Sequence, residues 1–275
     1  MPTAQAGEIT IGYDVHGKDG DWLVLVMGHA YARWAWNWQV SGLAERFRVV
    51  TFDNRGIGET GAPPAPYTVE QMAADTVALL DALGIERAHL IGTSLGGCIA
   101  LEVALSYPER VERLVLACTS LGGASPKSYP LMPAVVRIIE EAANEPAEVR
   151  LRRGTENAFA PGFVAEHPEV IDQVLALRDA TGQPLEAWLA QATAYPAYDA
   201  TDRVASLATE TLVVTGDQDN VIDARNSRVL AEMIPNASLI EMDGGHLFFI
   251  EQPERFNDLA ARFLAGGRTA VEARG

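Results

Sequence analysis

Short runs of branched apolar residues recur along the chain and alternate with longer segments of helical periodicity. Six such runs lie at residues 22–27, 48–53, 88–93, 113–118, 210–216 and 237–242. They are apolar on both faces, which is typical of strands in a parallel sheet that is covered on both sides. The pattern therefore predicts a buried parallel sheet.

Between these runs the apolar positions follow helical spacing. The clearest case is residues 68–84, where apolar residues recur every three or four positions and Gly84 stands at the end as a C-cap. Residues 95–107, residues 224–233 and the segment that begins near Pro253 show the same periodicity. Strand and helix alternate, so we predict an α/β fold with a doubly wound, mostly parallel sheet.

One interval is too long for a simple crossover between parallel strands. Cys118 and Glu210 are 210 − 118 = 92 positions apart, whereas a crossover needs about a dozen residues. The excess contains helical segments at residues 133–143, 169–180 and 184–193, which prolines and glycines separate. Ligands bind at the carboxyl ends of parallel strands, so we expect residues 121–200 to form a helical cap over that site. Residues 1–120 and 201–275 would form the core. A surface decoration far from any site is the alternative.

A serine stands between two glycines where a strand-like run meets a helical one. Residues 92–96 read Gly-Thr-Ser-Leu-Gly. A serine at such a sharp turn has a strained backbone that only small neighbours permit, and its hydroxyl projects above the sheet. The turn also aims the Leu95 N–H toward the same point, where it can stabilise an oxyanion. We predict that Ser94 is a nucleophile, in preference to a serine that only caps the helix.

A serine hydroxyl needs a base, and the base is expected to be a histidine oriented by a carboxylate. Among five histidines, His246 follows the last strand-like run on a loop that two glycines loosen, and apolar residues after it can pack the loop down. Asp217, Asp219 and Asp223 follow the preceding run. Asp219 is far enough past the strand end to point back toward His246. We expect Asp217 to cap the turn and Asp223 to begin the next helix.

The order Ser94, Asp219, His246 resembles that of α/β-hydrolases. The resemblance runs from about residue 8 to about residue 265, and its motifs are GTSLGG at 92–97, FDNRGIGET at 52–60, TGDQD at 215–219 and GGHLFFIEQPERF at 244–256. It implies an α/β-hydrolase fold with the helical cap inserted after the sixth strand. Residues 66–97 are also similar to the enol-lactonase and carboxylesterase branch. The dehalogenase and epoxide-hydrolase branches are excluded, because they would require aspartate at position 94.

The aromatic-rich run MGHAYARWAWNW occupies residues 27–38. The family places its second oxyanion donor here and usually has a His-Gly pair, which aligns with Met27-Gly28. The resemblance therefore implies that the backbone N–H of His29 faces the oxyanion, with Gly28 allowing close approach. Whether the His29 ring enters the pocket stays open.

Four other aromatic and apolar positions near the expected site are of interest. The resemblance implies that Trp36 packs at the start of the next helix. Trp34 is expected to meet substrate, and Leu247, which follows the predicted base, is expected to line the substrate pocket. Trp188 could line the pocket or pack the core of its own helix.

Arg55 lies between a strand end and two glycines in the sequence DNRGIG. It could clamp a substrate anion. The resemblance implies instead a structural turn beneath the active site, and we favour that interpretation.

Composition and charge exclude several classes of partner. The formal net charge is −16 and no basic stripe is present, so neither nucleic acid nor an anionic membrane is an expected partner. The N-terminus lacks the features of a secretory signal, and no apolar run is long enough to span a bilayer. We expect a cytoplasmic protein.

No cofactor and no metal are expected. Cys98 and Cys118 are far apart with apolar neighbours, so buried free thiols are favoured over a disulfide or a metal pair. No His, Asp, Glu or Cys cluster has metal-ligand spacing. The glycines of residues 56–61 do not open a dinucleotide-binding unit.

These residues predict a carboxylic-ester hydrolase that acts on a small or medium apolar ester or lactone through an acyl-enzyme. A lactonase or a C–C bond hydrolase would use the same three residues and differ in the cap. A non-catalytic small-molecule receptor on the same fold is the alternative from another class. The oligomeric state is open, with a homo-oligomer as one option.

Overall fold

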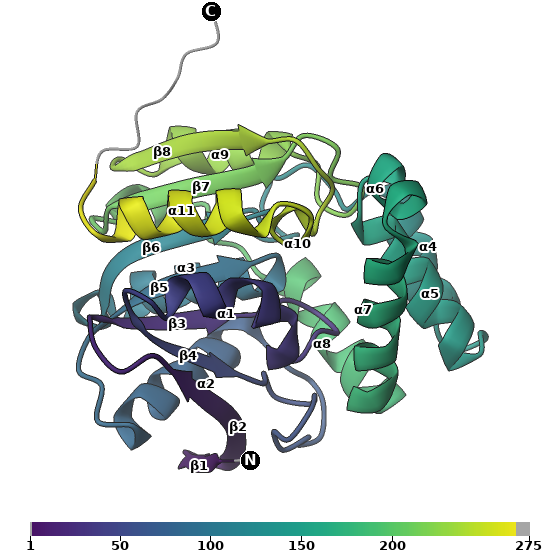
Figure 1. Cartoon of the computed structure of the whole chain (residues 1–275), viewed down its shortest axis with the longest axis horizontal. Helices are drawn as coiled ribbons and strands as arrows, with labels where there is room; N and C mark the ends of the chain where they lie inside the picture. Colours follow the sequence, from purple (N-terminus) through teal and green to yellow (C-terminus); the bar gives the residue numbers. More distant parts are fainter. Residues whose placement is uncertain (1, 268–275) are drawn as a thin grey trace, which may run out of the picture.

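The computed structural model describes residues 2–267 and contains an eight-stranded sheet flanked by helices (Figure 1). The strands are β1 (Thr3–Ala6), β2 (Ile9–His16), β3 (Trp22–Val26), β4 (Arg48–Phe52), β5 (Ala88–Thr93), β6 (Val111–Ala117), β7 (Thr211–Gly216) and β8 (Ala237–Met242). Their order across the sheet is β1-β2-β4-β3-β5-β6-β7-β8. β2 pairs antiparallel with β1 and β4, and the pairs from β4 to β8 are parallel.

The six strand-like runs of the sequence are confirmed as β3 to β8, and β1 and β2 were not predicted. β5 and β7 are buried at every position, which is why their sequences are apolar throughout. β1 and β2 have mixed burial; β1 lies at the sheet edge and β2 lies between β1 and β4. Such strands lack the continuous apolar run that marks the others.

Helices cover both faces of the sheet (Figure 1). They are η1 (Arg33–Trp36), α1 (Asn37–Leu43), α2 (Val69–Ala82), α3 (Leu95–Ser106), η2 (Pro108–Arg110), η3 (Val204–Ser206), α9 (Arg225–Met233), α10 (Phe248–Glu251) and α11 (Pro253–Leu264). One hydrophobic cluster joins α2 and α3 to the sheet, and a second joins α1 and α11 to its other face. Trp36 is fully buried in the second cluster, 5.4 Å from Phe249 between ring centroids, so it packs as expected.

Five α-helices lie between β6 and β7 in the chain, before η3, and are placed beyond one end of the sheet (Figure 1). They are α4 (Pro133–Glu141), α5 (Ala147–Ala158), α6 (Pro161–Glu166), α7 (Pro168–Thr181) and α8 (Leu185–Ala197). The sequence predicted α4, α7 and α8 but missed α5 and α6. α5 contains several arginines and buries one of these, Arg150. An apolar residue at this buried position would have made the helical periodicity visible in the sequence.

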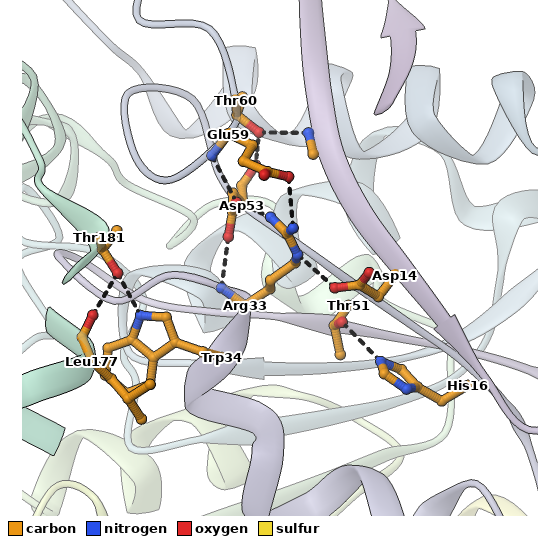
Figure 2. A network of polar contacts seen from close by, with 11 residues as sticks. Asp14, His16, Arg33, Trp34, Thr51, Asp53, Glu59, Thr60, Leu177 and Thr181 are labelled. Atoms are coloured by element: carbon orange, nitrogen blue, oxygen red, sulfur yellow. Dashed lines mark hydrogen bonds and ion pairs between the residues drawn. The ribbon is translucent and has the colours of Figure 1, made fainter. Parts of the chain in front are cut away.

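A polar network fixes the loop after β3 to the turn after β4 (Figure 2). The Arg33 guanidinium forms ion pairs with Asp14, Asp53 and Glu59, and Asp53 also accepts a hydrogen bond of 2.7 Å from the Arg33 backbone N–H. Arg55, from the same turn, is buried and pairs with Asp75 through Nε and Nη2 at 2.6 and 2.7 Å. Arg55 is therefore a structural residue of the turn, as favoured from the sequence.

Candidate active site

Ser94 occupies a strained turn between β5 and α3. Its φ and ψ angles are 56° and −125°, a region that L-residues rarely adopt. The flanking glycines make the turn sterically feasible. A Cβ on Gly92 would lie 2.3 Å from the Gly96 carbonyl oxygen, and one on Gly96 would lie 2.2 Å from the Val26 carbonyl oxygen. The turn places Ser94 in the lining of a cavity at the carboxyl end of the sheet.

His246 and Asp219 form a buried pair beside this cavity. His246 Nδ1 lies 2.8 Å from Asp219 Oδ2, and the His246 ring lines the same cavity as Ser94. The other carboxylate oxygen of Asp219 accepts the backbone N–H groups of Val221 and Ile222 at 2.8 and 2.9 Å. Because a carboxylate only accepts, Nδ1 carries the proton and Nε2 is left as the basic atom.

The two neighbouring aspartates have other partners. Asp217 accepts the Gly244 N–H at 3.2 Å, and Asp223 accepts the Arg225 N–H at 3.0 Å and pairs with its guanidinium. Both positions agree with their expected local roles. Of the three candidates, the structure brings only Asp219 to His246.

Opposing influences set the pKa of His246. Burial is the largest single influence and disfavours the imidazolium, but the interactions of His246 with Asp219 and Cys118 together outweigh it and raise the pKa of His246 well above its ordinary value of 6.5. Cys118 also contacts His246 and lines the cavity, and burial raises the pKa of its thiol. Cys118 is therefore a neutral thiol at neutral pH. Both cysteines are free and buried.

The backbone at residues 28–29 lies directly against Ser94. A Cβ on Gly28 would be 2.9 Å from the Ser94 Cβ, so this close approach requires glycine. The N–H groups of His29 and Leu95 donate no hydrogen bond to any residue within 2–267. These two backbone N–H groups are therefore free to donate to a ligand, and their role as an oxyanion hole stays a prediction.

The His29 ring, which the sequence left open, also lines the cavity. Its Nε2 lies 2.9 Å from the Trp188 carbonyl oxygen, and the two rings are 4.5 Å apart between centroids. Burial lowers the pKa of His29 to about 4, with smaller contributions from the cations Arg178 and Arg150. The ring is therefore neutral at neutral pH, with the proton on Nε2.

Trp34 corrects one expectation from the sequence. It does not line the cavity. Its indole N–H donates to the Thr181 hydroxyl at 2.7 Å, which ties the loop after β3 to the end of α7 (Figure 2). The indole of Trp34 turns toward α7 because a hydrogen-bond acceptor lies there.

Trp188 and Leu247 do line the cavity. The rest of the lining was not found from the sequence and is largely apolar. Its main members from the helical segment and the loop after β3 are Tyr31, Val135, Ile138, Ile139, Ala158 and Arg178. These side chains meet only in the folded chain, and their spacing carries no signal.

Between residues 2 and 267, no three His, Cys, Asp or Glu side chains are grouped so that they could hold a metal ion. Within the same range, every helix is too short or too polar to cross a membrane.

The fold and the site define a class. Residues 21–253 match the family model described as the alpha/beta hydrolase fold, so the chain belongs to the α/β-hydrolase family. It is 31% identical over 264 residues to a putative carbamate hydrolase RutD of Azorhizobium caulinodans, which covers 96% of this chain and 98% of that protein. It is 26% identical over 257 residues to 3-oxoadipate enol-lactonase 2 of Acinetobacter baylyi, with 93% of each chain covered. Among solved structures, the enol-lactonase from Burkholderia xenovorans LB400 superposes with a TM-score of 0.87 at 26% identity, over 96% of this chain and 100% of that one.

Proposed function

We propose that this hydrolase-fold protein is a serine hydrolase that cleaves the carboxylic ester of a small or medium substrate through an acyl-enzyme. One observation carries the proposal: Ser94, in a strained turn, shares a cavity with His246, whose Nδ1 is held by Asp219 at 2.8 Å. A nucleophile, a base and an orienting acid are the three parts that acyl transfer needs.

In the proposed mechanism His246 Nε2 takes the proton of the Ser94 hydroxyl as the oxygen attacks the ester carbonyl. The negative charge that develops on the carbonyl oxygen is stabilised by the N–H groups of His29 and Leu95. His246 then gives its proton to the leaving alcohol. Water repeats the cycle on the acyl-enzyme and releases the acid, while Asp219 keeps the imidazole in the required tautomer.

We infer that residues 121–200 act as a cap and that residues 2–120 and 201–267 form the core; residue 1 and residues 268–275 of the expected core lie outside the described residues. Support comes from the cavity, whose lining combines Ser94 and His246 of the core with Ile138, Arg178 and Trp188 of the helical segment. A substrate in this cavity is enclosed by the helices, which excludes water from the reacting bond.

A lactone is the second candidate substrate, because lactones are internal esters and need the same chemistry. The observation that favours it is the similarity to two proteins named as enol-lactonases, at 26% identity in each case. The relative named as a putative carbamate hydrolase adds a carbamate to the panel of substrates worth testing.

Labelling with a fluorophosphonate and hydrolysis of short p-nitrophenyl esters test the proposal. We expect wild-type protein to be labelled at Ser94 and to turn over the esters, and Ser94→Ala to lose both. Ser41→Ala, an exposed serine on α1, serves as the matched control and should match wild type. Tight ligand binding without labelling or product would support the receptor alternative instead.

A further inference from the structure

The cavity above Ser94 contains one fixed positive charge. Arg178 of α7 lines it, and no aspartate or glutamate is among the described residues of the lining. Arg178 is only 7% exposed, although a buried guanidinium is normally paired with a carboxylate. Its charge faces the space that the substrate would occupy.

Arg178 has no ionic partner among residues 2–267. No ion pair joins it to a described carboxylate, and its hydrogen bonds use Nη1 alone, which donates to the Leu151 carbonyl at 3.2 Å and to the Thr155 hydroxyl at 2.8 Å. Its Nε is buried without any hydrogen-bond partner. In a chain of net charge −16, a buried arginine without an acidic partner is a conspicuous exception.

Two other buried donors in the same lining are also without partners. They are the Tyr31 hydroxyl and the Trp188 indole N–H, from side chains that are 7% and 4% exposed. The Arg178 guanidinium lies over the Tyr31 ring, 4.6 Å from its centroid, so the side chains of Arg178 and Tyr31 are neighbours. An unpartnered buried polar group is costly, and three donors together indicate a ligand that supplies acceptors.

A second buried cation adds to the positive potential of this region. Arg150 of α5 is 7% exposed and lies 5.4 Å from the centroid of the Trp188 ring. Burial and the nearby charge of Arg178 lower the pKa of Arg150, whereas Glu145 raises it. Glu145 itself pairs with Arg153, and neither Arg150 nor Arg178 forms an ion pair with a carboxylate among residues 2–267.

We propose that Arg178, with the Tyr31 hydroxyl and the Trp188 indole N–H, forms a subsite for a carboxylate on the substrate. A carboxylate offers two oxygens with about four acceptor positions and matches the planar guanidinium. The substrate is then an ester or lactone that carries a carboxylate at one end, with an apolar middle that fits the rest of the lining. This inference rests on the proposed hydrolase function and extends it to the substrate class.

Matched pairs of esters test the subsite. The anionic set comprises the p-nitrophenyl monoesters of succinic, glutaric and adipic acid, which place the carboxylate at increasing distances from the reacting carbonyl. In the neutral set an isopropyl group replaces each terminal carboxylate. Ser94→Ala supplies the background rate, which matters because such monoesters also hydrolyse on their own.

We expect wild-type protein to favour the anionic ester in kcat/KM for at least one chain length. Arg178→Gln should lower the ratio of anionic to neutral kcat/KM by about 10- to 100-fold, chiefly through KM. Arg178→Lys should keep part of the preference, and Tyr31→Phe should reduce it by a smaller factor. Arg153→Gln, a charge change of the same kind in α5 but with its partners Glu141 and Glu145 outside the lining, should leave the ratio unchanged.

Two kinetic outcomes would overturn the subsite while leaving the hydrolase intact. One is the absence of an anionic preference at every chain length. The other is an equal loss on both esters in Arg178→Gln, which would mark a structural role for Arg178 through Leu151 and Thr155. If wild type and Ser94→Ala do not differ on any ester, the proposed hydrolase function fails instead. Calorimetric titration with glutarate then decides the subsite: binding that Arg178→Gln abolishes supports it, and absent or unchanged binding rejects it.

Discussion

His246 and Asp219 face each other across 2.8 Å, and the Asp219 carboxylate is at the same time held by the backbone N–H groups of Val221 and Ile222. One oxygen of Asp219 is therefore fixed by the main chain and the other fixes the imidazole. These two sets of hydrogen bonds restrict rotation of the imidazole ring. Because Nδ1 donates to Asp219, Nε2 is the ring nitrogen that is available as a base.

Asp219→Asn tests whether the Asp219 carboxylate sets the tautomer of His246, because it changes the chemistry of the side chain and leaves its size almost unchanged. The amide keeps the size of the carboxylate, but it can donate to Nδ1 and so favours the tautomer whose Nε2 carries the proton. We expect kcat/KM for a p-nitrophenyl ester to fall by about 10³- to 10⁴-fold, with little change in the unfolding temperature. Asp223→Asn is the control from the same loop and should stay near wild type. A loss below about tenfold in Asp219→Asn would show that His246 does not depend on this carboxylate.

The pH profile should report the raised pKa of His246. The base works only when neutral, so activity on a neutral ester is lost as the pH falls through the pKa of the free enzyme. Because the Asp219 charge raises that pKa well above 6.5, the acidic limb of kcat/KM should have its midpoint above 6.5. Asp219→Asn should move the midpoint of its residual activity to lower pH. A wild-type midpoint at or below pH 6.5 would show that burial lowers the pKa of His246 at least as much as its partners raise it, and would contradict this prediction.

Local sequence signals account for strands β3 to β8 of the sheet and for the choice of the predicted triad. β5 and β7 are buried along their whole length, so their apolar runs are unambiguous, and Ser94 stands where a strand must turn sharply into a helix. Asp219 and His246 follow the ends of neighbouring parallel strands, which places them at one edge of the sheet. Because β7 and β8 are neighbours in the sheet, residues that follow their carboxyl ends lie close together in space.

The cavity lining was harder to predict, because a residue lines the cavity through its place in the packed structure and not through a local sequence motif. Arg55, between glycines in a conspicuous motif, is neutralised by Asp75. Arg178, in an ordinary amphipathic helix, is the arginine that faces the cavity. Trp34 was expected there and instead bonds Thr181. Such differences depend on how the helical segment packs, which no short motif encodes.

Two substitutions at His29 distinguish its amide from its ring. His29→Ala keeps the backbone N–H and should retain kcat within about tenfold, since the ring is neutral, donates to the Trp188 carbonyl and takes no part in the proposed proton transfers. His29→Pro removes the N–H and should lower kcat by about 10²- to 10³-fold, the usual effect of losing one oxyanion donor. Circular dichroism and thermal unfolding would check that the proline variant folds. Equal and severe losses in both variants would assign the role to the ring.

Glu251 joins the loop that carries His246 to the helical segment. Its Oε1 accepts the Gly245 N–H at 3.1 Å and the Ala160 N–H at 2.9 Å. One carboxylate oxygen therefore connects the loop that carries His246 to the junction between α5 and α6. Glu251→Ala leaves two backbone donors without this partner and should reduce the free energy of unfolding by about 1–3 kcal/mol. It should also lower kcat, because the loop loses a restraint next to His246. Glu251→Gln retains a carbonyl oxygen that can accept both N–H groups and should lie much closer to wild type. Urea denaturation and ester hydrolysis measure the two effects. If both variants match wild type, the remaining contact, from the Leu247 N–H to the Ala158 carbonyl at 2.8 Å, is sufficient to hold the loop.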